Sequence, residues 1–224
     1  MVTRKKELLP LVLAALLCCG IMAVVDGILK PGYALKSAIK LCVFGAFPVI
    51  LSRLCRMTPI KELFRFRKRG FAVALMLGIG VYALILGAYF VIRPYFDFSG
   101  IAGKLTQNAG VNKDNFLYVS LYISLVNSLL EEFFFRGFLF TNAKKLSGRK
   151  FSYLFSALAF SLYHVAMMLG WFNIWLNVLV LVGLAVGGMI FNYLNEKFDC
   201  IYVSWLTHMF ANFAINTIGF MLLK

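Results

Sequence analysis

The sequence predicts an all-α fold, a polytopic membrane helical bundle with about seven transmembrane helices. Of its 224 residues, 62% are hydrophobic and only 14% are charged, and the mean hydropathy is +0.84. A soluble domain is closer to half apolar and a quarter charged. The chain also contains several apolar runs of roughly 20 residues, the length that a helix needs to cross a bilayer. These observations favour a membrane protein over a soluble one.

Seven apolar segments can be drawn, and they cover residues 8–25, 35–54, 70–92, 116–140, 151–169, 171–194 and 200–223. The first has a basic start, as a signal peptide has, but no small-x-small cleavage pattern follows it, so we interpret it as an uncleaved helix. The second is the weakest, because Lys36 and Lys40 lie near its start, where we expect them to snorkel to the interface. We divide the chain into residues 1–115, with three helices and an external loop, and a helical core of residues 116–224.

The basic residues indicate an orientation. The net charge is +14, and most of the Lys and Arg lie before the first segment, between the second and third, and between the fourth and fifth. By the positive-inside rule, this alternation predicts a multi-pass protein of the cell membrane with a cytosolic N-terminus. The 93–115 stretch would then be an external loop with a short interfacial helix. Because the charge is explained by topology, we expect no nucleic-acid partner.

Ionisable side chains inside the segments need a specific reason, because charge in mid-membrane is costly. Of the nine acidic residues, Glu131 and Glu132 lie within the fourth segment, and the two histidines, His164 and His208, lie within the fifth and seventh. Counting from the nearest lysines at the predicted cytosolic side, Glu131, His164 and His208 lie about 20, 21 and 17 Å deep at 1.5 Å per residue. The three groups are therefore expected to meet.

Helical spacing divides these groups into pairs. Glu132 and Arg136 are four residues apart and can form an ion pair on one face. Glu131 is rotated by about 100° from Glu132, so we expect that the two carboxylates cannot point at one partner and that Glu131 faces a cavity. His208 and Asn212 also share a face and offer neighbouring hydrogen-bond donors.

Such a set can hydrolyse an amide. A carboxylate beside an imidazole can act on water as a general base, and a His with an Asn can donate to the oxyanion that forms when water attacks. Alternatively, Glu131, His164 and His208 could bind Zn²⁺ with water as the fourth ligand, although the sequence HExxH is absent.

Simpler interpretations exist for each residue alone. A single His or Asn in a membrane helix commonly makes a packing hydrogen bond, and the acidic pair with its arginine can be a purely structural ion pair. A proton-coupled transporter would also use buried Glu and His, but we find no inverted repeat in the sequence. The coincidence of the polar groups at one depth favours a site over these alternatives.

These residues resemble the motifs of a known family. Glu131, Glu132 and Arg136 fit EExxxR, Phe160 and His164 fit FxxxH, and His208 and Asn212 fit HxxxN, in this order. The chain thus resembles the CPBP family of intramembrane peptidases, named for CAAX proteases and bacteriocin-processing enzymes and also called Abi. The resemblance covers residues 116–216, and the first three helices match nothing diagnostic.

The resemblance implies a role for each residue. Glu131 would be the catalytic carboxylate and would activate water together with His164. His208 and Asn212 would bind the oxyanion. Glu132 and Arg136 would give structural support. We expect an intramembrane endopeptidase whose site opens toward the cytosol, acting on a prenylated protein or a peptide at the membrane lipid. Family members have been viewed both as metalloproteases and as glutamate peptidases; we expect no cofactor, with Zn²⁺ as the alternative. A catalytically silent immunity or binding protein is the other alternative.

Overall fold

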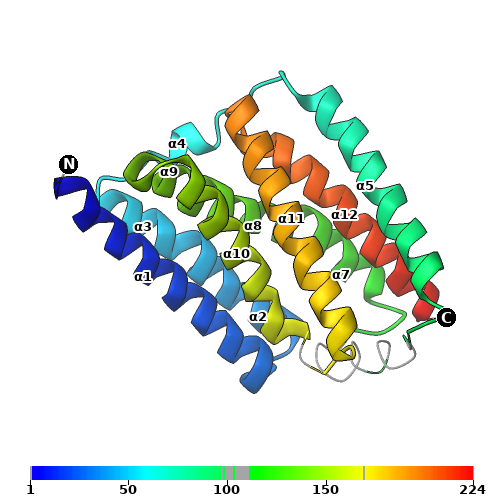
Figure 1. The fold of residues 1–224 in the computed structure, drawn as a ribbon. Helices are drawn as coiled ribbons and strands as arrows, with labels where there is room; N and C mark the ends of the chain where they lie inside the picture. The colour runs from blue at the N-terminus through cyan, green and yellow to red at the C-terminus, as the bar shows by residue number, and fades with distance from the viewer. Residues whose placement is uncertain (1, 97, 99–102, 104–110, 169, 224) are drawn as a thin grey trace.

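The computed structural model describes residues 2–96, 98, 103, 111–168 and 170–223, and the described residues form helices and turns without a strand. The helices lie side by side as one bundle (Figure 1). The predicted all-α fold is therefore confirmed. Most of the predicted external loop and its interfacial helix lie outside the described residues.

The N-terminal part forms three long helices. Helix α1 (Val2–Val24) continues into a π-helical end, η1 (Val25–Leu29). The second long helix consists of α2 (Tyr33–Lys40), a π-helical segment η2 (Leu41–Ala46) and α3 (Phe47–Leu54). A short helix, α4 (Ile60–Leu63), precedes the third, α5 (Phe71–Ile92). Each of the three agrees with a predicted segment.

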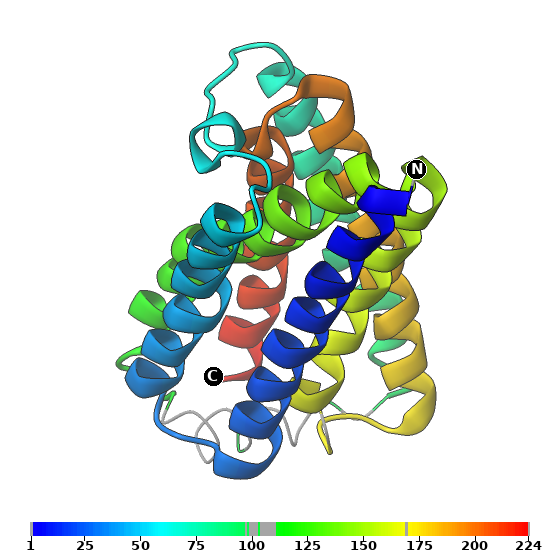
Figure 2. The same ribbon diagram turned by 90° about the vertical axis from the view of Figure 1, so that its left-hand side faces the viewer.

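The central helix is the longest of the bundle. It runs through α7 (Phe116–Tyr122), η3 (Ile123–Asn127), α8 (Ser128–Glu131), η4 (Glu132–Phe140) and α9 (Thr141–Ser147), with η3 and η4 in π-helical conformation. It extends beyond the predicted end at residue 140. Figure 2 shows this helix slanting across the bundle behind α1 and the α2–α3 helix, and it packs against both η2 and α12.

Three more helices complete the bundle: α10 (Arg149–Met168), α11 (Ile174–Phe198) and α12 (Ile201–Leu222). Six of the described helices are long and apolar enough to cross a membrane, and they correspond to the first six predicted segments. The seventh, α12, has the required length but carries a polar face that includes Thr207, His208 and Asn212. That face is directed into the bundle, where α12 packs along α5, α11 and the central helix.

Close helix contacts occur where glycine leaves room. A Cβ atom at Gly188 of α11 would lie 3.0 Å from the Cα of Ala157 in α10, and one at Gly78 of α5 would lie 2.6 Å from the Phe210 ring in α12. Lipid tails are as apolar as the side chains, so helices in a bilayer associate through van der Waals packing and hydrogen bonds rather than through burial from water. These glycines permit that packing.

An aromatic core joins the two parts of the chain. The ring of Phe44 in η2 stacks on Phe134 of η4 at 4.2 Å between centroids, and it meets the edge of Tyr163 in α10 at 5.2 Å. Phe44, Phe134 and Tyr163 are all buried. The N-terminal helices are thus packed directly against the helices that carry the motifs.

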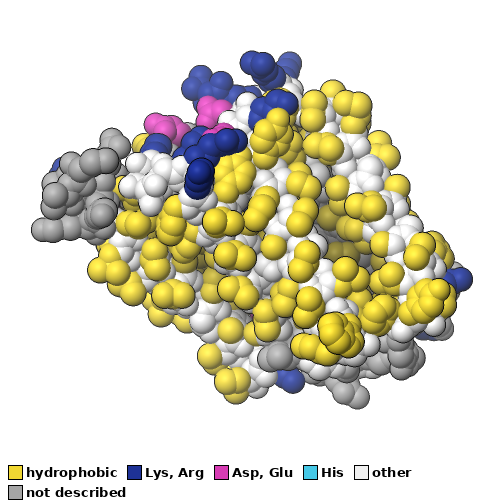
Figure 3. Space-filling view, viewed as in Figure 1, with side chains coloured by type: hydrophobic (Ala, Val, Ile, Leu, Met, Phe, Trp, Pro, Cys, Tyr) yellow, Lys and Arg dark blue, Asp and Glu magenta, His cyan; other side chains and the backbone are white. Residues whose placement is uncertain are grey.

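The surface agrees with a multi-pass membrane protein. Hydrophobic side chains cover most of the face seen in Figure 3, whereas Lys and Arg gather mainly near one end. Large apolar residues such as Leu16, Ile28 and Val91 are more than 60% exposed. A bilayer would cover this surface. The cytosolic position of the N-terminus stays a prediction.

Candidate active site

The predicted ion pair between Glu132 and Arg136 is present. Arg136 Nη1 lies 3.1 Å from Glu132 Oε1, and neither side chain is exposed. The guanidinium lies between aromatic rings, 4.2 Å from the centroid of Phe160 and 4.9 Å from that of Phe191. The negative charge of Glu132 and the faces of these two rings both reduce the energetic cost of burying this arginine.

The neighbouring carboxylate has a different partner. Glu131 is 2% exposed, and its Oε1 accepts hydrogen bonds from Lys40 Nζ at 2.5 Å and from Asn127 Nδ2 at 3.0 Å. Lys40 Nζ also donates to Asn127 Oδ1 at 2.5 Å. The prediction that Glu131 faces a cavity is therefore wrong, because an ammonium group from the second helix lies against it.

The prediction for Lys40 is also wrong. Its side chain does not snorkel to the interface but is 4% exposed, and its Nζ lies 5.0 Å from the ring centroid of Tyr163. The prediction that Lys36 snorkels is wrong as well, because Lys36 forms an ion pair with Asp26, whose side chain is only 1% exposed. In both cases a buried carboxylate offers the lysine a stronger partner than the distant headgroup region.

His208 lies between the two glutamates. Its Nδ1 is 2.9 Å from Glu132 Oε1, and its Nε2 is 3.7 Å from Glu131 Oε2. The expectation that the two carboxylates cannot share a partner is thus wrong. They point in different directions, but an imidazole has nitrogens on two edges and contacts one carboxylate with each. Since an ionised carboxylate only accepts hydrogen bonds, Nδ1 is the donor to Glu132.

His164 follows Phe160 by one turn of α10. Its Nδ1 lies 2.7 Å from the carbonyl oxygen of Phe160, so Nδ1 carries the proton and a neutral ring keeps Nε2 as an acceptor. Phe160 lies beside both histidines, with centroids 4.7 Å from His164 and 5.7 Å from His208. The FxxxH and HxxxN motifs are therefore adjacent in the fold.

Asn212 lies one turn after His208 on α12. Its Nδ2 donates to the carbonyl oxygen of Ile123 at 3.3 Å. One turn further, Asn216 Nδ2 donates to the carbonyl oxygen of Ser120 at 3.1 Å. These bonds connect α12 to the central helix, and the second N–H of the Asn212 amide remains for another acceptor.

The zinc alternative stays a hypothesis, and the geometry around Glu131 bears on it. Within the described part of the chain, no three His, Cys, Asp or Glu side chains are grouped so that they could hold a metal ion. A catalytic zinc site needs three such protein ligands. In addition, the Oε1 atom of Glu131 already accepts two hydrogen bonds from Lys40 and Asn127. Glu131, His164 and His208 do not form a ligand set in this arrangement.

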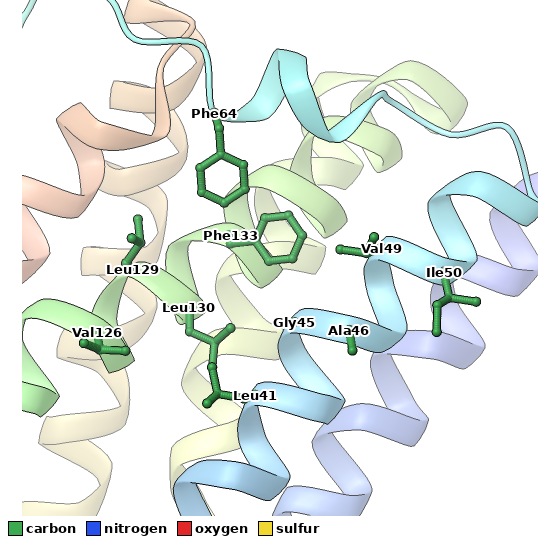
Figure 4. Close-up of a pocket in the computed structure, with 10 residues that line it drawn as sticks. All are labelled: Leu41, Gly45, Ala46, Val49, Ile50, Phe64, Val126, Leu129, Leu130 and Phe133. Carbon is green, nitrogen blue, oxygen red and sulfur yellow. The ribbon is translucent and has the colours of Figure 1, made fainter.

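Figure 4 shows an apolar groove. Its volume is about 450 Å³, and it lies between the α2–α3 helix and the central helix. Two of its lining residues, Leu41 and Leu130, are the chain neighbours of Lys40 and Glu131. The full lining consists of Leu41, Gly45, Ala46, Val49, Ile50, Phe64, Val126, Leu129, Leu130 and Phe133. This groove lies on the flank of the bundle; the opening toward the cytosol stays a prediction.

Two residues of this cluster were missed by sequence reasoning. Asn127 is four residues before Glu131, the same spacing that predicted the pair of Glu132 and Arg136, so the sequence carried a signal for it. Lys40 is seven residues into its helix, about 10 Å from the start. This depth argued only weakly that Lys40 does not reach the interface. The partner of Lys40, Glu131, lies 91 residues away in the sequence.

The fold and the cluster define a multi-pass membrane protein with a buried group of carboxylates and histidines. A comparison with family models identifies it further. Residues 113–214 match the model described as type II CAAX prenyl endopeptidase Rce1-like. Over this region the chain is similar to that family, which confirms the resemblance to the CPBP family and indicates a CAAX-protease-type enzyme in general class. No curated protein and no solved structure matches it.

Proposed function

We propose that this protein hydrolyses a peptide bond of a membrane-associated substrate, with a prenylated protein or peptide as the substrate class, through water activated by Glu131 and His164. The observation that carries this proposal is the arrangement around Glu131. One carboxylate oxygen, Oε1, is fixed by two donors, while the other, Oε2, is directed toward His208. A carboxylate held in this way is positioned to take a proton from water.

The reaction follows from the chemistry of these groups. Glu131, with the Nε2 acceptor of His164, removes a proton from water, and the hydroxide attacks the scissile carbonyl carbon. The tetrahedral oxyanion accepts hydrogen bonds from the second N–H of Asn212 and from Nε2–H of His208. Because Nδ1 of His208 already donates to Glu132, this role requires the doubly protonated ring, in which both nitrogens are donors. The C–N bond then breaks, and the proton held by Glu131 passes to the leaving amine. The products are a carboxylic acid and an amine, and the atoms and protons of this hydrolysis balance without a cofactor.

Glu132 and Arg136 support the site in this proposal. Glu132 accepts the hydrogen bond from His208 Nδ1, which fixes the orientation of the imidazole. Arg136 compensates the charge of Glu132. Neither residue is given a proton-transfer role.

The groove supports the proposed class of substrate. Its lining residues are apolar throughout, so it suits a hydrocarbon chain or an apolar peptide segment better than a charged one. A substrate held there would approach the site from within the bilayer. Phe64 and Phe133, whose ring centroids are 5.3 Å apart, lie together on its wall (Figure 4).

The proposal is tested by cleavage in a reconstituted membrane. Purified wild type and Glu131→Gln would be placed in phospholipid vesicles with a farnesylated peptide that ends in a CAAX sequence, and the products measured by mass spectrometry. Wild type should release the C-terminal tripeptide, and E131Q should remain at background because the amide cannot take the proton.

Near-normal cleavage by E131Q would contradict the proposal. Absence of cleavage by wild type, with and without the farnesyl group, would instead favour the silent binding or immunity protein. A proton flux across the same vesicles, measured with a pH-sensitive dye, would favour the transporter.

A further inference from the structure

The candidate site contains a charge from outside the family match. The matched region is residues 113–214, whereas Lys40 belongs to the second helix of the N-terminal part. Its ammonium nitrogen lies 2.5 Å from Glu131 Oε1, closer than His208 Nε2, which lies 3.7 Å from Glu131 Oε2. The N-terminal part therefore contributes a side chain to the site.

The geometry gives Lys40 a directional effect on Glu131. Lys40 Nζ and Asn127 Nδ2 both donate to Oε1, and neither hydrogen-bonds to Oε2. Lys40 also donates to Asn127 Oδ1, so the amide is fixed with its NH₂ group toward the carboxylate. The three side chains form a closed set of hydrogen bonds that holds Oε1 and leaves Oε2 on the side of His208.

The surroundings of Lys40 keep it in this position. Phe44 and Tyr163 place their rings 5.5 and 5.0 Å from Nζ, and these rings are themselves in edge contact. A buried ammonium group gains from such rings as well as from the carboxylate. Moving Lys40 toward the headgroups would leave Glu131 as a buried charge with one partner fewer, which is costly.

We propose that Lys40 is a positioning residue of the hydrolytic site, which together with Asn127 anchors Oε1 of Glu131 so that Oε2 is presented to water. This inference rests on the proposed function of Glu131. It also gives the N-terminal helices a role: they complete a site whose other residues all come from the matched region.

The test compares two lysines of one helix. Lys40→Met and Lys36→Met each remove an ammonium group from a buried carboxylate, but the partner of Lys36 is Asp26, whereas that of Lys40 is Glu131. In the vesicle assay, K40M should lower kcat about 100-fold with KM nearly unchanged, because small misplacement of a reacting group has effects of this size. K36M should lower the melting temperature but keep kcat close to that of wild type.

A second pair of variants covers the case in which K40M does not fold. The double variant Lys40→Met with Glu131→Gln leaves no uncompensated charge and should melt at a higher temperature than K40M. Asn127→Leu removes the other donor to Oε1 and should lower kcat by about 10- to 100-fold at unchanged KM, because a hydrogen bond to a charged group is lost.

The outcomes separate this inference from the proposed function. If wild type cleaves and E131Q does not, but K40M or N127L keeps the kcat of wild type, the positioning role is overturned and the proposed function stands. Equal losses of kcat in K40M and K36M would show a merely structural role. If E131Q cleaves normally, the proposed function fails first. A melting temperature of the double variant no higher than that of K40M would contradict the coupling between Lys40 and Glu131.

Discussion

The two adjacent glutamates lie in regions of opposite character. Glu132 and Arg136 are fully buried between α10, α11 and the central helix, and both belong to the matched region. Glu131 instead meets a lysine from the N-terminal part, and its chain neighbour Leu130 lines the apolar groove. One carboxylate is enclosed within a single part of the chain, and the other lies where two parts of the chain meet.

This difference indicates separate roles for the two glutamates, structural for Glu132 and chemical for Glu131. Neither side chain of the charge pair of Glu132 and Arg136 is exposed, so we expect its effect to be on folding and on the orientation of His208. A carboxylate beside a groove, with one oxygen fixed and the other directed at an imidazole, is suited to chemistry. His208 contacts both glutamates and therefore connects the structural pair to the proposed hydrolytic group.

The largest effect is expected from breaking the enclosed pair. Arg136→Met keeps the apolar volume but leaves Glu132 as an uncompensated buried charge, which typically costs about 3–5 kcal/mol. The melting temperature in detergent and the amount of folded protein in the membrane should both fall strongly. Arg136→Met combined with Glu132→Gln should recover much of the loss. A single variant as stable as wild type would show that Glu132 does not depend on Arg136.

The proposed oxyanion donor should affect turnover more than stability. Loss of one such donor typically lowers kcat by about 100- to 1,000-fold, and this is expected for Asn212→Ala. Asn216→Ala is the matched control, because Asn216 makes the same kind of bond to the central helix one turn away. An interhelical hydrogen bond in a membrane contributes only about 0.6 kcal/mol, so both variants should fold. Similar kcat values for N212A and N216A would remove Asn212 from the mechanism.

Much of this arrangement could be predicted from the sequence, and the reason is helical periodicity. The pair of Glu132 and Arg136 follows from a spacing of four, and six apolar runs gave helices that can span a membrane. The contact of Lys40 with Glu131 could not be predicted in this way, because it depends on which helices become neighbours. The position of His208 between the two glutamates depends on the crossing of α12 and the central helix, which a single sequence does not specify.

A smaller effect is expected at the contact that covers the enclosed pair. At Gly188, a Cβ atom would lie 3.0 Å from the backbone of Ala157 and 3.4 Å from Arg136 Nη2. Gly188→Ala should therefore separate α10 from α11 and lower stability by about 1–3 kcal/mol. The neighbouring Gly187 has no atom within 4 Å of the same position, so Gly187→Ala should leave the melting temperature unchanged or slightly raised. Equal effects of the two variants would show that the close approach of α10 and α11 is unimportant.

The smallest effect is expected from chelators. A site in which Glu131 is anchored by Lys40 should keep its activity after prolonged treatment with a strong chelator such as 1,10-phenanthroline. The assay is the cleavage of the farnesylated peptide before treatment, after treatment and after addition of Zn²⁺. Loss of activity that Zn²⁺ restores would instead support the zinc alternative with Glu131, His164 and His208 as ligands.

The most direct test of the division between the two glutamates is a paired measurement on Glu131→Gln and Glu132→Gln. Melting temperature in detergent and cleavage rate per folded molecule would be determined for both. E131Q keeps acceptors for Lys40 and Asn127, and a buried lysine can release its proton whereas an arginine cannot. E131Q should therefore melt closer to wild type than E132Q and show only background cleavage. E132Q leaves the Arg136 guanidinium uncompensated and should melt far lower. The reverse result, a stable but inactive E132Q beside an unstable but active E131Q, would contradict the account.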